Sequence, residues 1–167
     1  LSLFLCLSFI CVSGLWATDA PPAEITKAAR LGVAEFTQRG ITSEMSRPAA
    51  FKQGESVVST GYGFPVYTVT PKGMAVCSSL DAGAVRTGLW RFVVMSGDRA
   101  ASLITVARVK GNWQAVSIGG AQLADEITRI MKQWPQENGY SYRFIRIYQA
   151  RADFMEIRKN KNVVGYV

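Results

Sequence analysis

The sequence contains no histidine, and this absence excludes several kinds of active site. Without imidazole, the chain cannot form a Ser-His-Asp or Cys-His catalytic group, an imidazole proton relay or a histidine-ligated zinc site. Its three cysteines are equally limiting, because Cys6 and Cys11 lie in an apolar leader and Cys77 alone cannot form a thiolate zinc site. We therefore expect no metal centre and no cofactor.

Acidic residues are also scarce, with 12 Asp and Glu against 19 Lys and Arg. Paired carboxylates remain available for acid–base chemistry, but most acidic side chains lie beside basic ones. Asp125 and Glu126 fall in the first turn of an expected helix, where negative charge favours the helix dipole. No Ser-x-x-Lys motif is present. We expect a protein that is not an enzyme, with a histidine-free hydrolase that uses carboxylates as the alternative.

The net charge of +7 favours contact with anionic material such as envelope polymers, lipid headgroups or acidic proteins. It is also an ordinary charge for a small soluble domain. Basic and aromatic residues alternate in residues 140–167, a composition that occurs in proteins that bind single-stranded nucleic acid. A strand places Arg143 and Arg146 on opposite faces, however, so we expect these charges to protect a sheet edge and expect no nucleic-acid partner.

A long apolar run occurs only at the start of the chain. Residues 1–12 carry no charge, are too few to span a membrane, and are followed by small residues. This pattern is typical of a secretory signal peptide, with cleavage after Ala17 or Ala20. We expect a signal peptide in residues 1–20 and a single domain in residues 21–167, secreted or periplasmic in a bacterial envelope and without a membrane span after cleavage. An uncleaved anchor is the alternative.

Cleavage would leave Cys77 as a lone thiol. Its neighbours in the stretch GMAVCSSL are mostly apolar or small, and free cysteine is among the most frequently buried residue types. We expect Cys77 to be buried, and the alternative is a disulfide with another molecule.

Two segments have the character of helices. Residues 23–40 follow Pro21-Pro22 and end at a glycine. Their apolar stripe comprises Ile25, Ala28, Ala29, Gly32 and Phe36. The segment AQLADEITRIMKQWP is more strongly amphipathic and ends at Pro135. Its apolar stripe comprises Leu123, Ile127, Ile130, Met131 and Trp134.

The rest of the chain is dominated by strand patterns rich in β-branched and aromatic residues. These segments are GYGFPVYTVT, LWRFVVMS, SLITVARV, WQAVSIG, SYRFIRIYQ and a final hairpin formed by DFMEIR and VVGYV. Pro65 in the first of them indicates an edge strand or a bulge. The segment between residues 71 and 88 is rich in turn residues, and we assign it no element. We predict an α+β fold: a mainly antiparallel sheet of five or six strands, an N-terminal helix, and a second helix before the last strands.

The hairpin in LITVARVKGNWQAVSIGG has two possible registers. A two-residue turn at Gly111-Asn112 pairs Val106 with Ser117. A loop one residue longer pairs Ile104 with Ile118 and collects apolar residues on one face. Turn chemistry favours the first register, which we prefer, and hydrophobic segregation favours the second.

In either register, both faces of this hairpin carry apolar side chains. The strand LWRFVVMS shows the same feature, with Trp90 and Phe92 on one side and Val93 and Met95 on the other. A sheet with one face in water would alternate more cleanly. We therefore expect a sheet that is covered on both faces, by helices in part and otherwise by a loop, a second chain or a ligand.

Gly119-Gly120 lies between a strand and a helix, where backbone N–H groups bind anions. No complete phosphate-binding glycine motif is present, so we interpret the pair as a sharp turn. Large side chains with a polar group are better candidates for a binding surface. We select Trp90, Trp113, Tyr142 and Arg146, for which positions in the core are the alternative.

The spacing of FPVYTV, LITVARVKGNWQAVSIGG and GYSYRFIRIYQARADFMEI resembles a group of exported bacterial proteins without an assigned function. The resemblance covers strand and turn residues and includes no catalytic motif. It implies a bacterial envelope origin. Together these features predict an exported, non-enzymatic binding or protein-interaction module whose partner is a protein or a small-molecule ligand.

Overall fold

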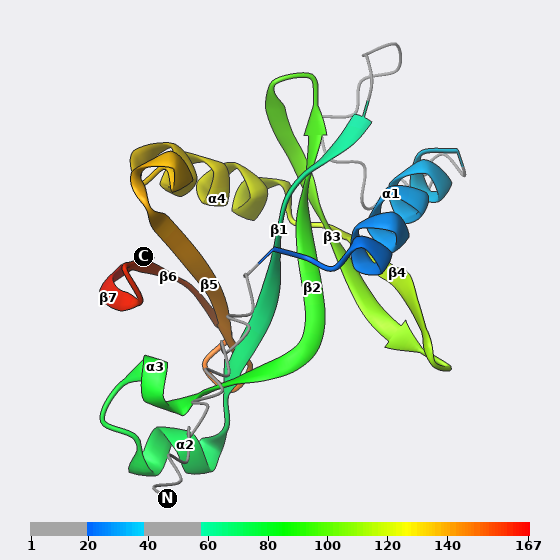
Figure 1. The fold of residues 1–167 in the computed structure, drawn as a ribbon. Coiled ribbons are helices and arrows are strands. Elements are labelled where there is room, and N and C mark those ends of the chain that lie inside the picture. Colours follow the sequence, from blue (N-terminus) through cyan, green and yellow to red (C-terminus); the bar gives the residue numbers. More distant parts are fainter. Residues whose placement is uncertain (1–19, 39–57) are drawn as a thin grey trace, which may run out of the picture.

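The computed structural model describes residues 20–38 and 58–167, which form an α+β fold (Figure 1). The expected signal peptide lies almost entirely outside the described residues, as does the connection at residues 41–56. No helix within the described ranges is long and apolar enough to cross a membrane.

The described strands form one sheet in the order β4-β3-β2-β1-β5-β6-β7. All neighbours are antiparallel except β1 and β5, which are parallel. The strands are β1 (Val58–Val69), β2 (Ala84–Ser96), β3 (Arg99–Val109), β4 (Asn112–Gly119), β5 (Tyr140–Ile147), β6 (Ala152–Lys159) and β7 (Asn162–Tyr166). The helices are α1 (Ala23–Gln38), α2 (Pro71–Val76), α3 (Leu80–Gly83), α4 (Ala121–Gln133) and the short 3-10 helix η1 (Gln136–Asn138).

The mainly antiparallel sheet and both expected helices are confirmed, but the sheet has seven strands rather than five or six. The seven strands include both strands of the expected C-terminal hairpin, in which Lys159 pairs with Asn162. Both residues of its turn, Asn160 and Lys161, have positive φ. This is the conformation of a type I′ turn, whose twist matches that of the flanking strands.

Helices cover opposite faces of the sheet, as the apolar character of both faces predicted. One core joins α1 to the α1-facing side chains of β2 and β3. Its buried members on these strands are Trp90, Phe92, Val94, Ile104 and Val106. A second core joins α4 to side chains of β1, β2, β3, β5 and β6. Its buried members on the sheet are Phe64, Val66, Val93, Leu103, Tyr142, Phe144, Met155 and Ile157.

Helix α1 lies close to β4 because a glycine faces the sheet. A Cβ atom placed on Gly32 would lie 2.1 Å from the Cβ atom of Ala115 on β4. Val33, which lies off the expected apolar stripe, is also buried, whereas Leu31 remains 62% exposed. The helix therefore buries a face centred on its small residues.

Pro65 lies in the central strand of the sheet, so the prediction of an edge strand was wrong and that of a bulge was right. The register with β2 shifts between Pro65 and Tyr67. The recorded pairing with β5 begins at Val66, directly after the proline. Proline has no N–H group to donate. It is accommodated at a position where β1 pairs with β2 and the ladder to β5 has not yet begun.

The β3–β4 hairpin follows neither expected register along its whole length. Its two-residue turn is Lys110-Gly111, one position earlier than expected, and both residues have positive φ. Val106 consequently pairs with Ala115 near the turn. A register shift beyond this pair then places Ile104 opposite Ile118, as the longer loop predicted. The bulge satisfies turn chemistry at one end and hydrophobic pairing at the other.

Two short helices occupy the segment to which the sequence analysis assigned no element. The side chain of Thr70 caps α2, in which Pro71 occupies the first turn, and the side chain of Ser79 caps α3. Cys77 lies between the two helices and is half-buried, with its side chain near Gly83. The prediction that Cys77 is buried is therefore wrong, because its side chain is only partly buried.

Replacing Gly32 with Ala tests the approach of α1 to the sheet. Alanine favours a helix by about 1 kcal/mol over glycine, but its methyl group would overlap Ala115. We expect Gly32→Ala to lower the free energy of unfolding by about 1–3 kcal/mol, measured by urea denaturation. The double variant Gly32→Ala/Ala115→Gly should recover most of this loss. A single variant as stable as the wild type would contradict the packing described here.

Candidate functional site

The structure does not bring the four candidate residues into one site. Trp90 and Trp113 line a cavity of about 250 Å³ beside the start of α1. Trp90 is buried in the α1-side core. Trp113 is partly buried, and its indole N–H donates a hydrogen bond of 3.0 Å to Glu24 Oε1 on α1. Both tryptophans thus help to hold α1 on the sheet.

Tyr142 is fully buried in the α4-side core, and its hydroxyl donates a hydrogen bond to the Trp134 carbonyl at the end of α4. It also lies at the base of a cavity of about 520 Å³ between the end of α4 and β1. Burial raises the pKa of the Tyr142 phenol, and the charge of Glu137 adds to this shift. The role of Tyr142 visible in the structure is to anchor the end of α4.

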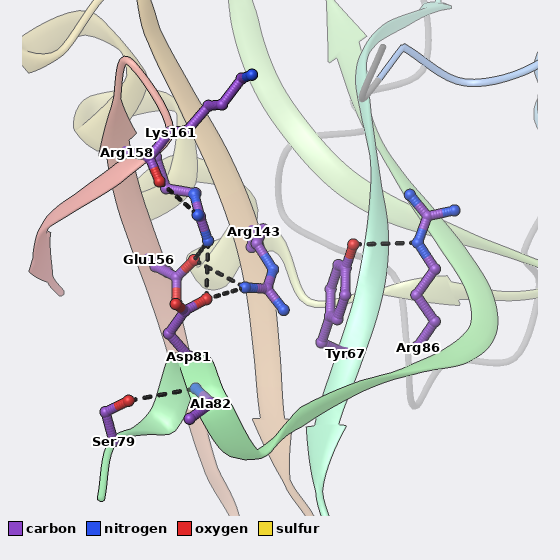
Figure 2. A network of polar contacts seen from close by, with 9 residues as sticks. All are labelled: Tyr67, Ser79, Asp81, Ala82, Arg86, Arg143, Glu156, Arg158 and Lys161. Atoms are coloured by element: carbon purple, nitrogen blue, oxygen red, sulfur yellow. Dashed lines mark hydrogen bonds and ion pairs between the residues drawn. The ribbon is translucent and has the colours of Figure 1, made fainter. Parts of the chain in front are cut away.

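A network of charged side chains lies on the opposite side of β5 and β6 from α4 (Figure 2). Asp81 on α3 accepts hydrogen bonds from Arg143 and from Arg158, the latter at 2.8 Å. Glu156 accepts hydrogen bonds from the same two guanidinium groups at 3.2 and 2.9 Å. The guanidinium of Arg143 also stacks on the ring of Tyr67, at 4.1 Å from its centroid. The two carboxylates balance the two guanidinium charges.

This network joins α3 to the sheet. Glu156 is completely buried, whereas the Asp81 side chain is 37% exposed. Although burial alone would lower it, hydrogen bonds to Glu156 and Asp81 raise the pKa of Arg158. The hydrolase alternative requires a carboxylate that is free to exchange a proton with a substrate. Here two arginines engage both carboxylates, so the arrangement favours a structural role.

A second polar group crosses the face that α4 covers. Arg91 on β2 pairs with Thr105 on β3, which in turn pairs with Ser117 on β4. Directly paired residues project to the same face of a sheet, and Val93, two residues after Arg91, belongs to the α4-side core. A polar row therefore runs across three strands of a largely apolar face.

This row lines a cavity of about 230 Å³ at the start of α4, which we call the basic cleft. Its residues are Arg91, Leu103, Thr105, Ser117, Ile118, Gly119, Gly120, Leu123 and Arg146. Arg146 comes from β5 and pairs with Asp153 on β6, with 3.6 Å between Arg146 Nη1 and Asp153 Oδ2. Asp153 itself lines a different cavity. Two arginines thus line the basic cleft, and none of the described acidic residues does.

Arg91 is incompletely satisfied by the described residues. Its guanidinium lies over the ring of Phe144, at 4.9 Å from the centroid, and so crosses β1 toward β5. Its Nη1 atom is buried and has no hydrogen-bond partner within residues 20–38 and 58–167. Burial lowers the pKa of Arg91, Asp153 opposes this shift, and the like charge of Arg146 adds to it.

The start of α4 contributes further donors to the basic cleft. Gly119 and Gly120 both have positive φ, which confirms the expected sharp turn. Gly120 is the N-cap residue and has no side chain to accept a hydrogen bond from the first turn. The first backbone N–H groups of α4 therefore lack the usual side-chain cap. They add positive potential at the same end of the cleft.

Sequence reasoning found Arg146 and the glycine pair but missed Arg91, Thr105 and Ser117. One signal for Arg91 was present, because an arginine interrupts the apolar run LWRFVVMS in a sheet expected to be buried on both faces. The cross-strand row could not be found, because it depends on the register of β3 and β4.

Among the described residues, no group of three acidic or cysteine side chains is placed to hold a metal ion. Comparison with protein-family models, curated proteins and solved structures found no match to this chain.

Replacing Glu156 tests the structural role of the charged network. We expect Glu156→Gln to lower the free energy of unfolding by about 3 kcal/mol, since it leaves two partly buried guanidinium groups short of a counter-charge. The matched variant Asp81→Asn should cost less than about 1 kcal/mol, because that carboxylate is more exposed. Urea denaturation measures both values. Equal costs for the two variants would contradict the burial described here.

The raised pKa of Tyr142 predicts a loss of stability at alkaline pH. The folded protein holds the phenol proton more tightly than the unfolded chain, so this contribution is complete below pH of about 10 and is lost as pH rises through the folded pKa. At pH of about 8, Tyr142→Phe should be less stable than wild type by about 1 kcal/mol, because it loses one hydrogen bond. Chemical denaturation at pH values from about 8 to about 11 should show that the difference in unfolding free energy between wild type and Tyr142→Phe shrinks as the pH rises. A constant difference would refute the assignment.

Proposed function

We propose that this protein is an exported, non-enzymatic binding module that holds an anionic group of its ligand in the basic cleft. The observation that carries the proposal is the buried Nη1 atom of Arg91, which has no hydrogen-bond partner within the described residues and belongs to a side chain that lines this cavity. Arg146 brings a second guanidinium to the same cavity.

Burial of the Arg91 guanidinium costs free energy. A guanidinium taken out of water loses hydration, and a donor without a partner costs about 1–3 kcal/mol. The like charge of Arg146 adds repulsion, which the larger attraction of Asp153 opposes. An anion in the basic cleft would accept the free donor and would reduce this repulsion, so the folded protein would bind it with charge-assisted hydrogen bonds. Asp153 partly balances Arg146 but does not line the basic cleft.

The size of the basic cleft limits the part of the ligand that it holds. Sites for whole drug-sized ligands have volumes of about 300–1,000 Å³, and this cavity is smaller, at about 230 Å³. It suits one charged group, with the remainder of the ligand outside. An anionic molecule of the cell envelope, with one charged group in the basic cleft, is consistent with the net charge of +7 and with the signal-like start of the chain.

Anion titration followed by NMR tests this proposal. Phosphate, sulfate and acetate are added in turn at constant ionic strength. We expect saturable shifts of the Arg91 side-chain N–H and of the backbone amides of Gln122 and Leu123. The variant Arg91→Gln/Arg146→Gln should weaken binding by about 100-fold, since it removes two charge-assisted interactions worth about 1.4 kcal/mol or more each.

The matched control is Arg99→Gln/Arg151→Gln, which removes the same charge from two exposed positions. It should bind anions as the wild type does. If both double variants weaken anion binding equally, the loss of affinity is explained by net charge alone and the site is refuted. Absence of saturable binding of all three anions to the wild-type protein would refute it as well.

A further inference from the structure

The donors of the basic cleft come from several elements that surround it. Arg91 enters from β2 and Arg146 from β5. Thr105 and Ser117 line the cavity from β3 and β4. Gly119, Gly120 and Leu123 line it at the start of α4, whose first turn has no side-chain cap. The residues that line the cavity are therefore distributed over four strands and the start of one helix.

This distribution distinguishes between two kinds of oxyanion. A carboxylate is planar, has two oxygens, and is fully engaged by the parallel donors of one arginine fork. The basic cleft is instead lined by two arginines on separate strands and by two hydroxyl residues on two further strands. A tetrahedral oxyanion directs oxygens toward all of these donors, as phosphate does when it binds arginine together with backbone N–H groups.

We infer that the anionic group held in the basic cleft is a tetrahedral oxyanion of the phosphate class, gripped by Arg91 and Arg146 and oriented by Thr105 and Ser117. This inference rests on the proposed function, because it names the ligand class of the same site. The arginines supply the charge. The hydroxyl groups supply the selectivity, because they donate to oxygens that a carboxylate does not have.

Two sources provide this chemistry, namely free inorganic phosphate and the phosphate ester of a larger molecule such as a lipid headgroup. The cavity of about 230 Å³ is larger than a phosphate ion needs, so it leaves room for the first atoms of an ester substituent. Glycerol phosphate is a soluble probe for the second source, and inorganic phosphate is the probe for the first.

Isothermal titration calorimetry at pH of about 7.5 and constant ionic strength tests the inference. We expect phosphate to bind at least about 10-fold more tightly than acetate, which corresponds to about 1.4 kcal/mol. The variant Thr105→Val/Ser117→Ala should reduce phosphate affinity by about 10-fold or more and leave acetate affinity within about two-fold. Thr105→Val keeps the shape of the side chain, and circular dichroism together with the thermal midpoint checks that the variant is folded.

The outcomes distinguish failure of the phosphate assignment from failure of the proposed anion site. If acetate binds as tightly as phosphate and both depend on Arg91 and Arg146, the site is real and the phosphate class is wrong. If the variant Thr105→Val/Ser117→Ala binds phosphate as tightly as the wild-type protein does, the inference is also overturned. If no anion binds the wild-type protein, the proposed function itself fails. Tighter binding of glycerol phosphate than of inorganic phosphate identifies an ester as the ligand, and the reverse order identifies the free ion.

Discussion

Strand β2 packs against helices on both of its faces, and the α1-side core and the α4-side core meet along it. Trp90, Phe92 and Val94 project toward α1, whereas Val93 projects toward α4. Burial of one such side chain contributes about 1.5–3 kcal/mol. Because both faces are covered, a polar residue in the middle of the sheet cannot simply turn toward water. Arg91 occupies such a position, and its surroundings follow from this constraint.

Two charged groups among the described residues differ in how their charges are balanced. On the side of the sheet opposite α4, Arg143 and Arg158 share Asp81 and Glu156, so the charges balance and fasten α3 to the sheet. On the α4 side, Arg91 reaches across β1 to Phe144 and keeps a buried donor without a described partner. Both groups contain buried atoms without a described partner, Arg143 Nε and Glu156 Oε2 in the first and Arg91 Nη1 and Asp153 Oδ1 in the second. The excess of positive charge at Arg91 and Arg146 therefore distinguishes the second group and supports the proposed anion site.

Much of the fold could be predicted from periodicity. The long amphipathic helix, the mainly antiparallel sheet and its two buried faces all follow from which residues are apolar. The Lys110-Gly111 turn could not be predicted, because the bulge that reconciles it with the Ile104–Ile118 pair is a compromise between distant contacts. The same limit hid the basic cleft, since Arg91, Thr105 and Ser117 become neighbours only through strand register. We select Trp90 and Tyr142 as binding candidates because they are large. The same large apolar area favours their burial in the cores.

The most direct test of the account is a crystal structure grown with tungstate, a heavy tetrahedral oxyanion whose anomalous signal locates it. The account predicts one strong anomalous peak in the basic cleft, within hydrogen-bond distance of Arg91 Nη1 and near Arg146. Peaks confined to exposed lysine and arginine side chains, with the basic cleft free of tungstate, would contradict it.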